Sequence, residues 1–170
     1  MDYRPLMNKA ILITLTFLSL VAVGPLQAQS HEGWAFSLGG FDVIDSDKAV
    51  EFGTEYRFEP FRFWRLDLKP VIGASGTGEG NYWVYGGARW DIPMPSEHWI
   101  ITLGFAVSAY EQGSGKDLGG TAEFRSSLEL AYRLSSGSRV GVSFYHLSNA
   151  RIYDLNPGSE SLVFTWSFGR

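Results

Sequence analysis

From Gly33 to Phe168, apolar side chains alternate with polar or small ones, and this period of two limits the chain to β-structure. Successive side chains of a strand point to opposite faces, so an alternating segment has one apolar and one polar face. In one such segment, the two faces are formed by Val50, Phe52, Thr54, Tyr56 and Phe58 and by Glu51, Gly53, Glu55, Arg57 and Glu59. The pattern predicts an all-β protein.

Eight alternating segments follow one another along the chain. We expect strands at about residues 33–43, 48–60, 63–74, 81–91, 97–110, 120–134, 138–149 and 160–168. The turns between them are rich in Gly, Pro, Asp and Ser, which favour tight reversals. Eight segments of about ten residues are typical of an antiparallel transmembrane β-barrel of the outer-membrane type. Because no linker divides them, we expect residues 29–170 to form a single eight-stranded β-barrel domain.

The composition fits two kinds of barrel. The chain is 15% aromatic and yet its mean hydropathy is −0.05, because apolar and charged side chains cancel in the average. If the apolar face meets lipid, the polar side chains fill the narrow interior of an eight-stranded barrel. We expect that interior to contain ion pairs drawn from Glu51, Glu55, Asp67, Glu123, Glu129, Arg57, Arg65, Lys69, Arg89, Arg125 and Arg133. A soluble lipocalin-like barrel, with its apolar face inward, is the alternative.

The first 28 residues are organised like a secretory signal peptide. Arg4 and Lys9 form a basic start, residues 10–23 are almost wholly apolar, and the small residue Ala28 ends the segment. A membrane-spanning helix needs about 20 apolar residues, and this stretch is shorter. We expect cleavage after Ala28 and export of the mature chain, which favours the membrane barrel over the soluble one.

The composition also excludes several classes of function. The sequence has no Cys, which excludes disulfides, thiolate metal sites and a cysteine nucleophile. Its formal net charge of −4 argues against nucleic acid as a partner. Other candidate sites fit structural roles better: the isolated His31 and His98, the turn residues Asp42, Asp45 and Asp47, and the Gly76–Gly80 loop. We expect neither a metal nor a cofactor.

Three polar residues break the alternation near the C-terminus. His146 and Ser148 continue the apolar row of Val140, Val142 and Phe144, so they share the face that is expected to meet lipid. Across the turn, Glu160 has the same parity as the apolar residues Leu162, Phe164, Trp166 and Phe168. If paired residue numbers sum to about 306, His146 lies opposite Glu160, and Ser148 lies one diagonal step away.

Ser, His and a carboxylate on one patch are the components of a hydrolytic triad: nucleophile, general base and the group that orients the imidazole. An unpaired Glu facing lipid costs several kcal/mol, which argues against a chance placement. The alternative is that these residues only lie in the headgroup zone, where charges cost little. If both termini are periplasmic, the 150–159 turn is extracellular and the patch faces the outer leaflet.

The run His146-Leu147-Ser148-Asn149, with Asn156-Pro157-Gly158 and Glu160 after it, resembles the C-terminal motif of the PagL family of lipid A 3-O-deacylases. That resemblance implies an integral outer-membrane esterase that removes the 3-O-linked acyl chain of lipid A, in lipopolysaccharide, without a metal. Carried over to this chain, Ser148 is the nucleophile, His146 the base and Glu160 the residue that orients it.

The resemblance also implies an oxyanion hole made by an Asn side chain and a backbone amide. Asn156 matches that Asn, and Asn149 is expected to support the site. Some members have a glycine that supplies the amide, whereas this chain has Ala150-Arg151 and departs from the pattern. Arg151 is a candidate contact to a lipid A phosphate or an ordinary exposed charge.

Two other functions remain alternatives at this stage. One is a non-catalytic eight-stranded outer-membrane barrel for adhesion or structural support, and the other is a soluble periplasmic barrel that binds an apolar ligand. The partners expected under the favoured hypothesis are lipid A and the surrounding outer-membrane lipids, and a homodimer is left open.

Overall fold

The computed structural model describes residues 32–92, 94–96 and 98–168. The expected signal peptide, residues 1–28, lies outside this part of the chain. Within the described residues, no helix combines the length and the hydropathy that crossing a membrane requires.

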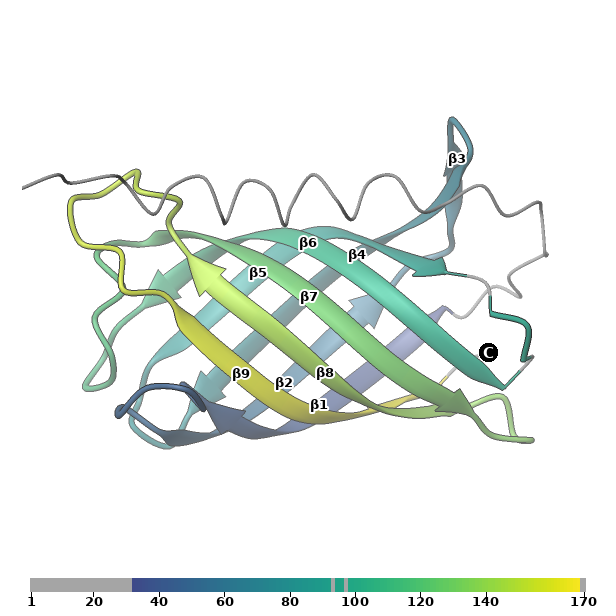
Figure 1. The fold of residues 1–170 in the computed structure, drawn as a ribbon, viewed down its shortest axis with the longest axis horizontal. Coiled ribbons are helices and arrows are strands. Elements are labelled where there is room, and N and C mark those ends of the chain that lie inside the picture. Colours follow the sequence, from purple (N-terminus) through teal and green to yellow (C-terminus); the bar gives the residue numbers. More distant parts are fainter. Residues whose placement is uncertain (1–31, 93, 97, 169–170) are drawn as a thin grey trace, which may run out of the picture.

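The described residues form nine strands that pair in one antiparallel sheet (Figure 1). They are β1 (Gly33–Phe41), β2 (Ala49–Arg57), β3 (Phe61–Phe63), β4 (Leu66–Thr77), β5 (Tyr82–Ile92), β6 (Trp99–Glu111), β7 (Ala122–Arg133), β8 (Arg139–Ser148) and β9 (Ser159–Ser167). The sheet closes because β1 pairs with β9 and β2 pairs with β4. Eight strands, all except β3, therefore form a closed barrel, which confirms the predicted fold class.

The barrel has two distinct ends. At one, which we call the termini end, β1 begins and β9 finishes, since Ala35 pairs with Ser167. The other, which we call the loop end, carries the loops 42–48, 78–81, 112–121 and 149–158, and Figure 1 shows it on the left.

The strand expected at 63–74 is misplaced in the prediction. It is observed as β4, Leu66–Thr77, and the short strand β3 precedes it. β3 pairs only with the start of β4, in a hairpin that projects from the termini end (Figure 1). The turn of this hairpin places Trp64 at φ 59°, in the left-handed region. The apolar side chains change from odd to even positions between Phe63 and Trp64, which is the signal of this turn that the prediction missed.

The outer surface of the barrel is apolar, as expected for a wall that meets lipid. Large hydrophobic side chains are exposed on every barrel strand, among them Phe36, Phe52, Ile72, Val84, Phe105, Leu130, Val142 and Phe164. Aromatic residues gather at the termini end, where the Trp34–Tyr56, Tyr56–Phe58, Trp99–Tyr132 and Trp166–Phe168 ring pairs lie. A wall with an apolar band and an aromatic girdle is that of a transmembrane barrel. The soluble alternative places this surface inside and is wrong.

The interior is filled by ion pairs and aromatic rings. Glu55 and Glu129 each bind both Arg57 and Arg89, at distances of 2.6–3.3 Å. Nearer the loop end, the Arg125 guanidinium stacks 3.9 Å from the Tyr145 ring centroid. Because the charges are paired across the interior, they crosslink strands that are distant in sequence.

Two members of the predicted interior set lie elsewhere. Arg65 is exposed in the turn of the hairpin, and Asp67 pairs with Arg62 on the hairpin's surface. Their place in the interior is taken by Asp91, which binds Lys69 at 2.6 Å and Arg139 at 2.8 Å. The cause is the shifted start of β4, which places Arg65 and Asp67 on the projecting hairpin.

The interior pairs predict a large stability difference between two similar substitutions. Glu129→Gln leaves the buried Arg57 and Arg89 without a shared counter-charge, and we expect it to lower the free energy of unfolding by roughly 3–5 kcal/mol. The matched control is Asp67→Asn in the exposed Arg62–Asp67 pair, for which we expect less than about 1 kcal/mol. Urea unfolding of the barrel in lipid vesicles measures both. Equal losses would contradict the assigned role of the interior network.

Candidate active site

The three residues that break the alternation meet at the loop end of the β8–β9 hairpin. β8 ends at Ser148, β9 begins at Ser159, and the loop 149–158 connects them. His146 pairs directly with Glu160, and Phe144 pairs with Leu162. The register therefore has paired residue numbers that sum to 306, as the sequence predicts.

His146 and Glu160 are joined by a hydrogen bond on the outer wall. His146 Nδ1 lies 2.8 Å from Glu160 Oε1, and the two side chains are 42% and 22% exposed. An Nδ1–H that donates to the carboxylate leaves Nε2 with a free lone pair, which is the tautomer that a general base requires. The partial exposure keeps this base accessible from the outside of the barrel.

Ser148 shares the outer face of His146, but the two side chains are not bonded. Ser148 pairs with Phe124 of β7, and within the described chain its hydroxyl forms no hydrogen bond with the imidazole. Two residues along a strand are about 6.6 Å apart, so contact requires the Ser148 side chain to turn back toward His146. The structure thus brings together the His–Glu pair and places the serine beside it.

Gly158 makes room for the imidazole, a role that the sequence analysis missed. A Cβ at this position would lie 2.7 Å from His146 Cε1 and 3.4 Å from Nε2. Its φ of 72° also belongs to the left-handed region that favours glycine. The available signal was its position: a register sum of 306 puts residue 158 opposite Ser148.

The side chain of Asn149 links two loops through hydrogen bonds. Its side chain is fully buried and donates from Nδ2 to the carbonyl oxygens of Leu118 and Leu155, each at 2.8 Å. Its Oδ1 accepts the N–H of Arg151 at 2.9 Å. Because both ends of the amide are engaged within the protein, Asn149 can hold the loop 149–158 in place but cannot donate to a substrate.

Asn156 differs from Asn149 in having one end of its amide fixed and the other available. Its Oδ1 accepts the backbone N–H of Asn149 at 3.0 Å, which determines the orientation of the side chain. Within the described residues its Nδ2 makes no hydrogen bond, and the residue is partly exposed. An oriented and free amide N–H group is suited to bind a developing negative charge.

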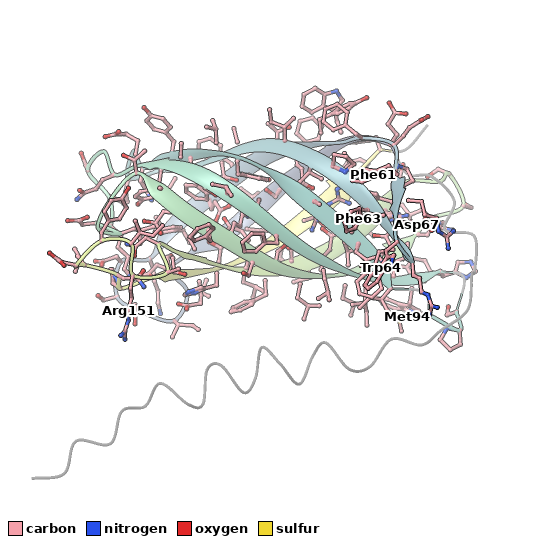
Figure 2. All side chains as sticks on the ribbon, turned by 90° about the horizontal axis from the view of Figure 1, so that it is seen from above. Phe61, Phe63, Trp64, Asp67, Met94 and Arg151 are labelled. Carbon is pink, nitrogen blue, oxygen red and sulfur yellow. The ribbon has the colours of Figure 1, made fainter. Side chains whose placement is uncertain are left out.

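The turn after Ser148 is held in an unusual backbone conformation. Ala150 and Arg151 have φ values of 52° and 65°, and Ile152 N–H donates to Asn149 O across them. The left-handed region costs a non-glycine residue roughly 1–2 kcal/mol. The turn therefore has the backbone that glycine prefers, and the Arg151 side chain points away from the barrel at the loop end (Figure 2).

A partly buried lysine binds carboxylates next to Glu160. Lys116 Nζ binds Asp42 Oδ1 at 2.6 Å and Asp45 Oδ2 at 3.0 Å, and oxygens of Asp42, Asp45 and Glu160 all lie within 4.8 Å of one another. Burial alone would lower the pKa of Lys116, but the two carboxylates outweigh it and raise the pKa above its ordinary value. The lysine therefore remains charged at neutral pH and partly neutralises this acidic group.

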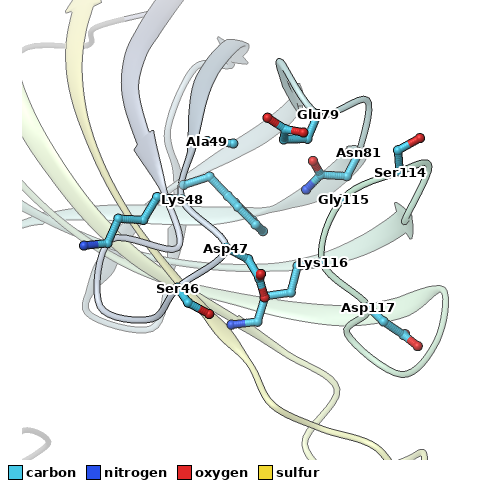
Figure 3. Close-up of a pocket in the computed structure, with 11 residues that line it drawn as sticks. Ser46, Asp47, Lys48, Ala49, Glu79, Asn81, Ser114, Gly115, Lys116 and Asp117 are labelled. Atoms are coloured by element: carbon cyan, nitrogen blue, oxygen red, sulfur yellow. The ribbon is translucent and has the colours of Figure 1, made fainter.

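The barrel mouth contains a polar cavity that is separate from the His–Glu pair. It has a volume of about 300 Å³, and Figure 3 shows Asp47, Lys48, Glu79, Asn81, Lys116 and Asp117 around it. His146, Ser148 and Glu160 are not among its lining residues, because their side chains are on the outer wall. The candidate active site is thus a surface site that faces the membrane.

The remaining sequence candidates have structural surroundings. His98 stacks on Tyr132 with ring centroids 5.4 Å apart, at the termini end. Asp42 accepts the N–H of Asp47 at 3.1 Å, which agrees with the predicted turn. His31 lies outside the described residues, and the Gly76–Gly80 segment spans the end of β4 and the turn after it.

With a closed barrel, an apolar outer wall and an outward-facing site, this protein is an integral β-barrel of the outer-membrane type. The family model described as lipid A 3-O-deacylase (PagL) matches residues 49–169. The chain therefore belongs to the PagL family, as its motif predicts.

Three known proteins are similar to this chain in sequence or in fold. The lipid A deacylase PagL of Bordetella bronchiseptica is 30% identical over 118 residues, which are 61% of this chain and 63% of that protein. The match thus spans slightly less than two thirds of the relative's length. The crystal structure of the outer membrane enzyme PagL has a TM-score of 0.66 at 17% identity and covers 81% of this chain and 99% of its own. The Yersinia pestis outer membrane protein Ail has a TM-score of 0.47 at 10% identity, with the same coverage.

The Lys116 contacts predict a local stability effect. Lys116→Met removes the only ammonium that binds Asp42 in the described structure and leaves that fully buried carboxylate without a counter-charge, at a cost of roughly 1–3 kcal/mol. We expect hydrogen–deuterium exchange to accelerate at least about fivefold in peptides covering residues 42–48 and 112–121. Lys48→Met, at an exposed lysine of the same loop, is the control and should leave exchange unchanged. The same acceleration in both variants would contradict a specific stabilising role of the Lys116–Asp42 ion pair.

Proposed function

We propose that this protein is an ester hydrolase that removes the 3-O-linked acyl chain of lipid A, with Ser148, His146 and Glu160 as its catalytic triad. The observation that carries the proposal is the 2.8 Å hydrogen bond between His146 and Glu160, beside Ser148 on the lipid-facing wall. A carboxylate-bound imidazole next to a hydroxyl is the arrangement that serine hydrolases share. Family membership and the Bordetella relative's name support the substrate.

The height of the site on the wall supports a lipid substrate. Ser148 lies eight residues beyond Val140 on β8, which is about 21 Å along the barrel axis for a strand tilted by about 40°. The apolar band of such barrels is about 25 Å tall, so Ser148 lies near its border at the loop end. With both termini in the periplasm, this border belongs to the outer leaflet, where acyl esters of lipid A are found.

In the first half of the reaction, Ser148 Oγ attacks the ester carbonyl while His146 Nε2 accepts the hydroxyl proton. Glu160, bound to Nδ1–H, stabilises the imidazolium that forms. The tetrahedral intermediate breaks its bond to the sugar oxygen, which leaves with the proton from Nε2. Water then hydrolyses the acyl-enzyme with the same base, which releases the fatty acid and restores Ser148.

The proposal requires the gap between Ser148 and His146 to close. Both residues lie on one outer face, and the small Gly158 leaves the imidazole unobstructed on the β9 side. Catalytic hydrogen bonds are often long in a free enzyme and shorten when substrate is bound. Rotation of Ser148 about χ1 toward Nε2 on lipid binding is therefore part of the proposal.

Asn156 Nδ2 is the proposed side-chain donor to the oxyanion, because its amide is oriented by Asn149 and otherwise free. The backbone donor departs from the family pattern. The Arg151 N–H is already engaged by Asn149 Oδ1, whereas the Ala150 N–H makes no hydrogen bond within the described residues. We assign the backbone contribution to Ala150. Each such donor contributes about 10²–10³ in rate.

Replacing the nucleophile tests the proposal directly. Ser148→Ala should lower lipid A deacylation by about 10³-fold or more, since the acyl-enzyme can no longer form. Mass spectra of lipid A from cells expressing each variant would show retention of one 3-O-linked acyl chain. Ser143→Ala, at a buried serine on the interior face of the same strand, should retain wild-type activity. Unchanged lipid A masses with a well-folded wild-type barrel would favour the non-catalytic alternative.

Gly158→Ala tests whether the close contact between residue 158 and the His146 imidazole affects activity, apart from any effect of backbone strain on stability. The added methyl group displaces His146, and we expect kcat to fall by about 10–100-fold, because a displacement of about 1 Å is costly in catalysis. Gly137→Ala is the control, since Gly137 has φ 87° and open space around its Cβ position. Both variants should lose similar stability in urea, and only Gly158→Ala should lose activity. Equal activities would contradict the proposed role of this contact.

A further inference from the structure

The β3–β4 hairpin has two chemically different faces and no partner within the described chain. Phe61 pairs with Leu68 and Phe63 pairs with Leu66, so these four apolar side chains share one face. Arg62 pairs with Asp67 on the other face, where their charged groups lie 3.7 Å apart and are largely exposed. The hairpin is therefore an amphipathic two-stranded ribbon.

Its apolar side chains are among the most exposed of the molecule. Phe61 and Phe63 are 49% and 61% exposed, and Trp64 at the turn is 94% exposed. Figure 2 shows all three at the opposite end of the barrel from Arg151. An isolated two-stranded ribbon is marginally stable in water, and exposure of three aromatic rings to water is energetically unfavourable.

The apolar face of the hairpin continues the wall that meets lipid. Leu66 and Leu68 have the same parity on β4 as Ile72, which is 57% exposed on the outer wall, whereas Lys69 and Val71 point inward. The row of outward side chains therefore runs without a break from the membrane-facing wall onto the hairpin. Whatever covers the wall at this height also meets the hairpin.

The height of the hairpin is set by the aromatic girdle at the termini end. Tyr56 and Phe58, with ring centroids 4.8 Å apart, belong to the girdle, and β3 begins three residues after Phe58. Aromatic girdles of transmembrane barrels lie at the boundary between headgroups and acyl chains. Trp in particular prefers that boundary, because its ring is apolar and its N–H is a hydrogen-bond donor.

We propose that the β3–β4 hairpin is an interfacial anchor that lies in the phospholipid leaflet at the termini end, with Phe61, Phe63 and Trp64 inserted among the lipids. The Arg62–Asp67 face remains in the headgroup water. The anchor holds the barrel at a fixed depth in the bilayer, and it does so independently of the proposed catalytic function.

The absence of cysteine from the chain allows a direct test by spin labelling. Single-cysteine variants at Phe61 and Phe63 place a nitroxide on the apolar face, and variants at Arg62 and Asp67 place it on the matched polar face. Each barrel is folded into vesicles of phosphatidylethanolamine and phosphatidylglycerol, and its folding is checked by heat-dependent migration on gels. Power saturation then measures the accessibility of each label to oxygen, which concentrates in lipid, and to a water-soluble nickel chelate.

Two further positions calibrate the measurement. Phe164→Cys marks the lipid-facing wall, where this residue is 73% exposed, and Ser136→Cys marks an exposed turn at the termini end. We expect labels at 61 and 63 to resemble the Phe164 label, with an oxygen-to-nickel ratio at least about threefold above that at 62 and 67. A ratio like that of the Ser136 label at all four positions would overturn the proposal and place the hairpin in water. Protection of 61 and 63 from both probes would overturn it in favour of contact with a second copy of the chain.

Discussion

The absence of water from the membrane interior is the constraint on which this structure depends. An unpaired backbone N–H or C=O group in hydrocarbon costs several kcal/mol, so a strand can cross only as part of a closed ladder. Closure is achieved by the β1–β9 and β2–β4 pairings. Once the ladder is closed, the parity of each residue decides whether its side chain meets lipid or the interior.

The filled interior determines where chemistry can take place. Glu55, Glu129 and the arginines between them occupy the middle of the barrel, and Trp83 and Tyr145 fill it toward the loop end. No acyl chain can enter such a core, so a lipid substrate can only be met on the wall. The His146–Glu160 pair lies on that wall near the border of the apolar band, a position that suits the proposed lipid substrate.

Contacts from several parts of the structure fix the positions of the residues at the candidate site. The ladder between β8 and β9 places His146 opposite Glu160. Asn149 ties the loop after Ser148 to the 112–121 loop, and Lys116 ties that loop to Asp42 beside Glu160. The loops of the loop end therefore act as one support. The same arrangement leaves the side chains of the proposed triad on the outer wall.

The sequence by itself determined the strand parity, the closed-barrel class and the His146–Glu160 register, because these follow from a period of two and a single short connection. It did not determine the β3–β4 hairpin: the apolar residues change from odd to even positions between Phe63 and Trp64, but a three-residue strand is too short for a period of two to define. Nor did it reveal the Asp91–Arg139 pair or the Lys116–Asp42 contact, whose members are 48 and 74 residues apart. Parity gives the face of a strand residue such as Asp91 or Arg139 but not its partner across the interior, and loop residues such as Lys116 follow no period at all. Only closure of the barrel brings them together, so tertiary structure decided the support of the site.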